Sequence, residues 1–120
     1  MYMAGYRELK VWRLAMELAE DVYKLCAEFP KHEVYELSSQ LQRAAVSIPS
    51  NIAEGQARNS SKEFGHFLGI ARGSLAEMET QIMLAQRLNY LTAKKVNPAL
   101  EKAEEIGKML KGLQKTISTN

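Results

Sequence analysis

The chain has little proline, glycine or cysteine. Its 120 residues include 3 prolines, 7 glycines and 1 cysteine. Because proline and glycine are the residues least compatible with a helix interior, their scarcity predicts long helices. The single cysteine, Cys26, excludes an intrachain disulfide and a metal site built from several cysteines. We expect Cys26 to be a reduced, partly buried and inert thiol.

The chain also lacks an excess of charge of one sign and a long apolar run. It has 16 Lys+Arg against 14 Asp+Glu, and a net charge of +2 is too small to identify a nucleic-acid binder by itself. No uncharged apolar run approaches the ~20 residues that a membrane span needs. Residues 1–5 lack the basic and apolar regions of a signal peptide. We therefore expect a cytoplasmic protein without a membrane partner.

Motifs for catalysis and for cofactor binding are also missing. Neither of the common glycine-rich phosphate loops is present, and no nucleophile stands in a recognisable constellation. Glu63 and His66 have the Glu-x-x-His spacing of di-iron bundles, but those bundles use the motif twice and this chain has it once. The other histidine, His32, is expected in a loop. We predict no enzyme, no cofactor, no metal site and no small-molecule substrate.

Apolar residues recur at spacings of three and four along most of the chain, which is the pattern of amphipathic helices. The pattern predicts four helices, at about 8–28, 34–57, 61–89 and 93–117. Such helices with short connections predict an all-α fold, an antiparallel up-down-up-down four-helix bundle that forms one domain over residues 1–120.

Local signals mark the ends of these helices. Pro30 ends the first one, since a proline disfavours helical backbone in the residue before it. Ser60 and Glu63 form a capping box at the start of the third helix. Two starts remain open for the fourth helix: Thr92 as the N-cap, or Asn97 as the N-cap with the following proline at the first helical position.

The chain is organised around residues 43–55, which read as helix interior although they contain Pro49. An interior proline costs about 3 kcal/mol, and we expect Ser47 and Ser50 to satisfy backbone groups near it. Polar residues form one row on this helix and a second row on the third helix: Arg43, Ser47, Ser50 and Glu54, and Ser74, Glu77 and Gln81.

Connected helices of a bundle are antiparallel neighbours, so the two polar rows are predicted to face each other in a buried or interfacial network. Arg43 would pair with Glu54 or Glu77, within or between subunits. Such a network would fix register more than it adds stability. The alternative is two solvated faces.

The first predicted helix carries two adjacent apolar rows, whereas a bundle helix needs an apolar stripe of only about 100°. The second row contains Leu9, Trp12, Met16 and Tyr23. Surplus apolar surface usually marks a contact site, so these four residues are predicted to form an oligomer interface. Two alternatives remain: a deeply buried helix in a monomer, or a monomeric or dimeric adaptor that binds an amphipathic partner helix.

Two further patterns have alternative readings. Gly65, Gly69 and Gly73 lie on one line of the third helix, which suggests either close approach of another backbone or tolerance on a solvated face. Two groups of basic residues are candidates for nucleic-acid contact, and one of them precedes a helix N-terminus, where phosphate binds readily. The groups are Arg7, Lys10 and Arg13, and Arg58 and Lys62.

Four segments of the chain resemble the bacterial four-helix-bundle family encoded in intervening sequences of ribosomal RNA genes, formerly labelled a ribosomal protein. They are Tyr6-Arg7-Glu8-Leu9-x-Val11-Trp12, residues 43–55, residues 61–64 and residues 73–81. The chain also looks related to the accessory variability determinant protein of diversity-generating retroelements. The resemblance implies a ring-like homopentamer without established enzymatic activity, for which a nucleic-acid role is proposed. The retroelement proteins are markedly basic, whereas this chain has nearly balanced charge.

Overall fold

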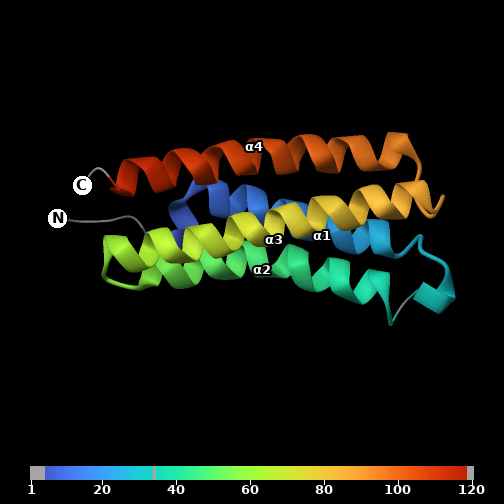
Figure 1. The fold of residues 1–120 in the computed structure, drawn as a ribbon, viewed down its shortest axis with the longest axis horizontal. Helices are drawn as coiled ribbons and strands as arrows, with labels where there is room; N and C mark the ends of the chain where they lie inside the picture. Colours follow the sequence, from blue (N-terminus) through green and yellow to red (C-terminus); the bar gives the residue numbers. More distant parts are fainter. Residues whose placement is uncertain (1–4, 34, 119–120) are drawn as a thin grey trace.

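Four long helices make up almost all of the computed structural model, which describes residues 5–33 and 35–118. The helices are α1 (Lys10–Cys26), α2 (Leu37–Ala57), α3 (Ser61–Arg87) and α4 (Ala93–Ser118), and two short 3-10 helices are η1 (Tyr6–Glu8) and η2 (Lys31–Glu33). The described residues contain no strand. The helices run antiparallel along a molecule 49 Å long (Figure 1). The predicted all-α four-helix bundle is confirmed.

The helix boundaries differ from the predicted ones at two of the four starts, and α1 and α3 each end two residues earlier than predicted, at Cys26 and Arg87. α1 begins at Lys10 rather than at residue 8, because Leu9 has extended backbone (φ −74°, ψ 124°) between η1 and α1. α2 begins at Leu37, and its predicted first residue, Val34, lies outside the described residues.

The starts of α3 and α4 follow from their N-caps. The Glu63 backbone N–H donates to the Ser60 hydroxyl at 3.2 Å, so the predicted cap is confirmed. At α4 the Lys95 backbone N–H donates to the Thr92 hydroxyl at 3.4 Å. Pro98 lies inside α4. Thr92 is therefore the N-cap, and the alternative start at Asn97 is wrong.

Every helix contributes to one continuous core. The large side chains that are fully buried come from all four helices: Leu18, Val22, Leu41, Ile48, Ile52, Leu68, Met78, Ile82, Val96, Ile106 and Leu110. The most extensive helix contact joins α2 and α3. The two helices are close together at Gly55, where an added Cβ would lie 2.6 Å from the Cβ of Phe67.

α2 passes through Pro49 without ending, as predicted. The hydroxyls of Ser47 and Ser74 lie 2.8 Å apart and share a hydrogen bond. The Asn51 amide donates to both the carbonyl and the hydroxyl oxygen of Ser47, each at 2.8 Å. Ser50 is exposed and makes no hydrogen bond to another described residue. Asn51, rather than Ser50, thus supplies the polar contacts beside the proline.

No other backbone of the described chain approaches the line of glycines on α3. An added Cβ would meet nothing within 4 Å at Gly65 or Gly73, and only the Gln114 amide, at 3.4 Å, at Gly69. The Gln114 side chain also donates to the Gly65 carbonyl at 3.1 Å. Within the chain, the idea of a close backbone is wrong, and a side chain of α4 covers part of the line instead.

An ion-pair cluster joins the first and last helices. The Lys102 ammonium lies 2.7 Å from the Asp21 carboxylate and 3.7 Å from that of Glu17. The hydrogen bond to Asp21 raises the pKa of Lys102 above its usual value. The cluster ties α4 to α1 across the edge where the bundle closes.

Candidate functional site

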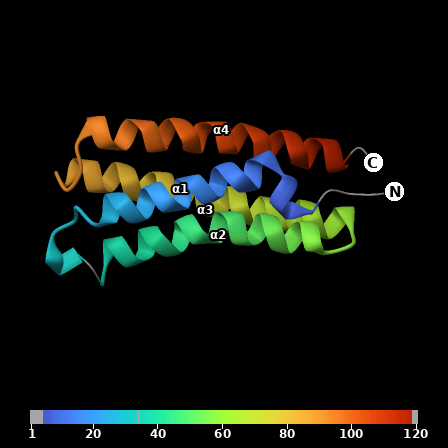
Figure 2. The same ribbon diagram turned by 180° about the vertical axis from the view of Figure 1, so that it is seen from behind.

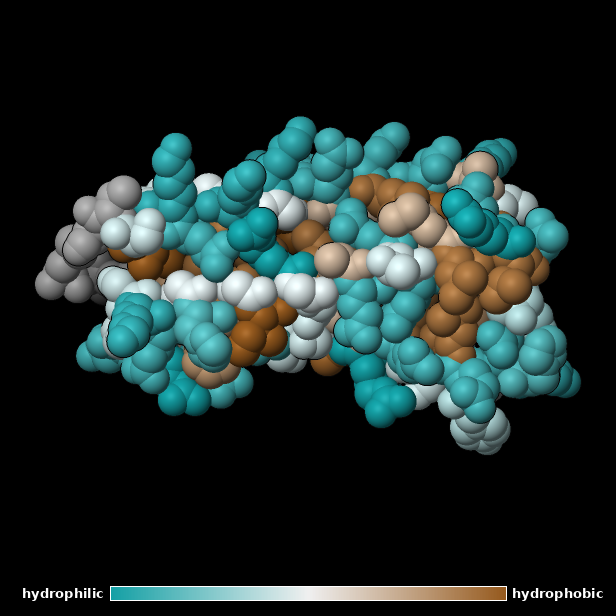
Figure 3. Space-filling model, viewed as in Figure 1, coloured by the Kyte–Doolittle hydropathy of each residue, from teal (hydrophilic) through white to brown (hydrophobic). Residues whose placement is uncertain are grey.

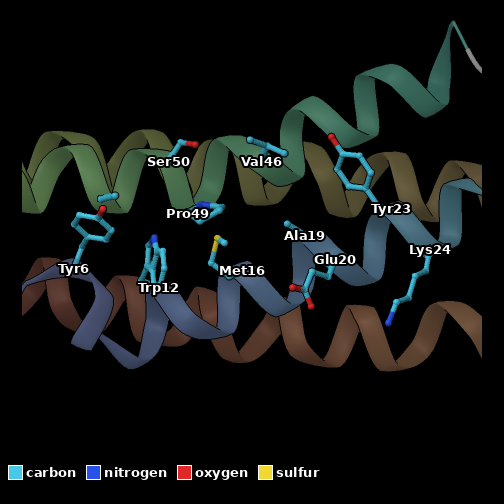
Figure 4. Close-up of a pocket in the computed structure, with 11 residues that line it drawn as sticks. Tyr6, Trp12, Met16, Ala19, Glu20, Tyr23, Lys24, Val46, Pro49 and Ser50 are labelled. Carbon is cyan, nitrogen blue, oxygen red and sulfur yellow. The ribbon is translucent and has the colours of Figure 1, made fainter.

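An apolar groove of about 720 Å³ runs between α1 and α2. Figure 2 shows these two helices side by side, and Figure 4 shows the groove itself. We call it the α1–α2 groove. Its lining residues are Tyr6, Trp12, Met16, Ala19, Glu20, Tyr23, Lys24, Val46, Pro49, Ser50 and Ala53.

The groove forms where the second apolar row of α1 faces α2. In Figure 4, Trp12 and Met16 point from α1 toward Pro49 of α2. Met16 is 40% exposed, Tyr23 50% and Val46 41%, so the groove is open to water. The Tyr6 and Trp12 rings stack edge to face at one end, with centroids 5.3 Å apart.

Three of the four residues predicted for the interface line this groove: Trp12, Met16 and Tyr23. Leu9 is not among the lining residues, and it packs against the edge of the core. The groove also has a wall on α2, formed by Val46, Pro49 and Ala53, that the sequence did not reveal. The only indication of this wall in the sequence was that these three residues lie on a side of α2 away from its row of core residues.

Pro49 lies at the centre of the groove. In Figure 4 the ribbon of α2 changes direction near Val46, less than one turn before Pro49. A proline ring clashes with the carbonyl of the residue four positions earlier, which is a standard cause of helix kinks. The shape of the groove therefore depends on Pro49.

The two polar rows meet only in part. Ser47 of α2 and Ser74 of α3 are hydrogen-bonded to each other. Glu54, however, pairs with Arg58, whose guanidinium lies 3.0 Å from its carboxylate, and not with Arg43. Arg43 forms no ion pair with any described residue, so its predicted pairing within one subunit is absent. Sequence reasoning overlooked Asn51, although its spacing of four from Ser47 was available.

The other members of the polar rows differ in burial. Ser50 and Glu77 are exposed. Gln81 is 9% exposed, and its side-chain oxygen has no hydrogen-bond partner among the described residues. A pairing of Arg43 with Glu77 between subunits stays a prediction.

The two basic groups lie at the same end of the bundle, where η1 is next to the α2–α3 connection (Figure 1). Arg58 is partly neutralised, because it lies 3.0 Å from Glu54 and 3.5 Å from Glu63. The side chain of Arg13 donates to the carbonyl of Arg7 at 2.8 Å. The side chains of Lys10 and Lys62 are exposed.

The described part of the chain was also compared with the requirements of a metal site, a membrane span and a reactive cysteine. No three His, Cys, Asp or Glu side chains there gather as a metal site requires, and no helix there is both long and apolar enough to cross a bilayer. The Cys26 thiol donates to the Ser38 carbonyl at 3.8 Å, and burial raises its pKa. Since the thiolate is the nucleophile, Cys26 is a poor one.

A second apolar surface, which sequence reasoning did not find, lies on α3. Ile70 and Leu84 of α3 and its C-cap residue Leu88 are exposed by 39%, 45% and 46%. Their spacings of 14 and four residues place them on one side of the helix, and we call them the α3 ridge. Figure 3 shows apolar side chains gathered toward the end of the bundle where α3 ends. The sequence did contain apolar residues on α3 outside the core spacing, which is the signal for such a surface. Gly73 and Glu77 interrupt the row that these residues form.

Comparisons with known proteins agree with this architecture. A family model described as "23S rRNA-intervening sequence protein" matches residues 7–112. A solved structure from Bacteroides thetaiotaomicron, described as a protein with unknown function from the S23 ribosomal protein family, is 26% identical to this chain. The TM-score is 0.81, and the match covers 88% of this chain and 95% of that one. A search of curated proteins found no match.

Proposed function

Because the chain belongs to the 23S rRNA-intervening sequence protein family, we propose that it is a non-enzymatic, homo-oligomeric interaction module whose copies form a ring of five. The family description names no reaction. The number five rests on the resemblance described above. The relation to retroelement accessory proteins stays a prediction.

The observation that carries this proposal is the open α1–α2 groove. Large exposed apolar patches mark interaction sites in proteins. Burying an exposed side chain of this size contributes about 1.5–3 kcal/mol. Met16, Tyr23 and Val46 are already about half buried, so covering them contributes roughly half of that for each one. Three such side chains in one groove supply a driving force for association.

The shared position of the two basic groups supports an association with nucleic acid, such as ribosomal RNA. Five copies with a charge of +2 each carry +10, and ring symmetry would repeat each basic end five times. Repeated weak contacts give avidity without any strong single contact. Because Arg58 is held in ion pairs, we assign the principal contacts to Lys10, Lys62 and Arg7.

The alternative function is that of an adaptor whose groove binds an amphipathic helix of another protein. Such helices bind by laying an apolar face into an apolar groove, and the α1–α2 groove has that composition. On this alternative the isolated protein is a monomer or dimer, and its exposed groove binds a hydrophobic dye.

Light scattering on a sizing column tests the proposal. We expect a mass near five times the subunit mass of 13.5 kDa. RNA titration at several salt concentrations then measures the number of phosphate contacts from the slope of affinity against salt. A mass of one subunit would refute the assembly and favour the adaptor. An affinity that does not change with salt would refute the nucleic-acid association alone.

A further inference from the structure

We propose that the α1–α2 groove of one copy holds the α3 ridge of the next copy. This inference rests on the proposed function, since it assumes that the chain assembles with itself. It goes further by naming the surface that fills the groove.

The distribution of exposed apolar side chains is the first argument. Eight large apolar side chains are exposed in the described part of the chain. Met16, Tyr23 and Val46 lie in the groove. Three of the other five belong to α3, namely Ile70, Met83 and Leu84, and Leu88 is the C-cap residue of the same helix. The surplus apolar surface is thus confined almost entirely to the groove and to one helix on another side of the molecule.

Shape is the second argument. Two grooves placed face to face cannot fill each other, and they would leave a cavity of about twice the 720 Å³ of one groove. Protein interfaces pack about as densely as protein interiors, so the groove needs a convex apolar partner. A helix with exposed Ile70, Leu84 and Leu88 has that form, and α3 is the helix that presents such a row in the described residues.

Charge is the third argument. Glu77 lies midway between Ile70 and Leu84 in the sequence, so docking of the ridge would bring its carboxylate to the groove. A carboxylate at an interface needs a counter-charge. Lys24 lines the groove on α1, as does the acidic Glu20, and Arg43, which forms no ion pair with a described residue, lies one turn from Val46 on α2. Lys24 or Arg43 of the neighbouring copy would supply that counter-charge.

The consequence is a head-to-tail interface. Each copy uses two different surfaces to bind its two neighbours. Such association ends when the copies close into a ring, and otherwise it continues as an open filament. A stable interface buries about 800 Å² on each partner. Two interfaces per copy would therefore cover roughly a fifth of the 7472 Å² surface of one copy.

The first experiment compares the masses of Leu84→Glu and Asn97→Glu with that of the wild type by light scattering. Both changes add one negative charge at an exposed position, but Asn97 is on α4 and is neither a lining residue of the groove nor a ridge residue. We expect Leu84→Glu to reduce the mass at least twofold and Asn97→Glu to leave it unchanged. Circular dichroism confirms that each variant is folded.

The second experiment uses a short bifunctional maleimide on cysteine variants. We expect Val46→Cys/Leu84→Cys to give a ladder of covalent multimers, and each single variant to remain uncrosslinked like the wild type, whose Cys26 is buried. Dimers from Val46→Cys alone would show groove-to-groove contact and overturn the inference.

The two proposals fail in different ways. A wild-type oligomer whose mass is unaffected by Leu84→Glu overturns the ridge assignment and leaves the assembly intact. A monomeric wild type overturns the proposed function itself, and the inference with it.

Discussion

Replacing Gly55 by alanine tests how closely α2 and α3 must approach. The added Cβ would lie 2.6 Å from Phe67 Cβ and 3.2 Å from Phe64 Cδ1. Carbon atoms pack best at about 3.5–4.0 Å, so the helices must separate by roughly 1 Å. Because the obstructing Phe67 atom is a Cβ, it cannot move without its backbone. A rotamer change therefore cannot relieve the clash.

Two effects of opposite sign decide the magnitude. Alanine is favoured over glycine in a helix interior by about 1 kcal/mol. Overpacking a filled site costs about 1–3 kcal/mol. We therefore expect Gly55→Ala to destabilise the fold by about 1 kcal/mol. A change of that size lowers the melting temperature of a domain of this length by about 4 °C.

Gly112→Ala is the matched control. Gly112 is also inside a helix, but an added Cβ there would meet nothing within 4 Å. It should keep the helix-propensity gain and stabilise the fold by up to about 1 kcal/mol. Both variants are compared with the wild type by urea denaturation at one subunit concentration, because association shifts apparent stability. If Gly55→Ala is as stable as Gly112→Ala, the close contact at Gly55 does not limit the fold.

Two further substitutions and one labelling experiment test other parts of the structure. Trp12→Glu should dissociate the assembly, as measured by light scattering, while circular dichroism shows that the helices remain; unfolding instead would make Trp12 a core residue. Lys102→Gln should lower stability in urea by at most about 1 kcal/mol. The pKa of Lys102 is raised in the folded state. Its contribution to the free energy of unfolding is therefore fully present below the pKa of Lys102 in the unfolded chain, and it is lost as pH rises through the pKa in the folded protein. The difference between wild type and variant should therefore vanish at strongly alkaline pH, and a constant difference would show a role in packing only. Cys26 should react slowly with a thiol reagent in the native protein and rapidly in urea, and equal rates would contradict its burial.

The sequence predicted the core well because burial follows helical periodicity. Leu18, Ile48, Met78 and Ile106 all occupy predicted apolar positions and are fully buried. The start of α1 was less predictable. Leu9 continues the apolar spacing but has extended backbone, and periodicity alone does not report backbone angles.

The site was only half predictable. The surplus row on α1 identified Trp12 and Met16, but the opposite wall depends on how α2 bends and packs, which requires three dimensions. The partner of Glu54 was missed because the nearby Arg58, one turn away, competes with the more distant Arg43. Sequence spacing places residues on faces, but it does not decide among several partners of similar charge.

The ion-pair cluster at Lys102 also has a kinetic consequence. Contacts between α1 and α2, α2 and α3, and α3 and α4 each join helices adjacent in the chain, whereas α1 and α4 are separated by most of its length. Distant segments pay the largest loop-closure entropy, so we expect α4 to dock onto α1 after the folding transition state. Loss of a late contact accelerates unfolding and leaves the folding rate nearly unchanged. The link between Lys102 and Asp21 would then set how long the closed bundle persists before α4 detaches, rather than how fast it forms.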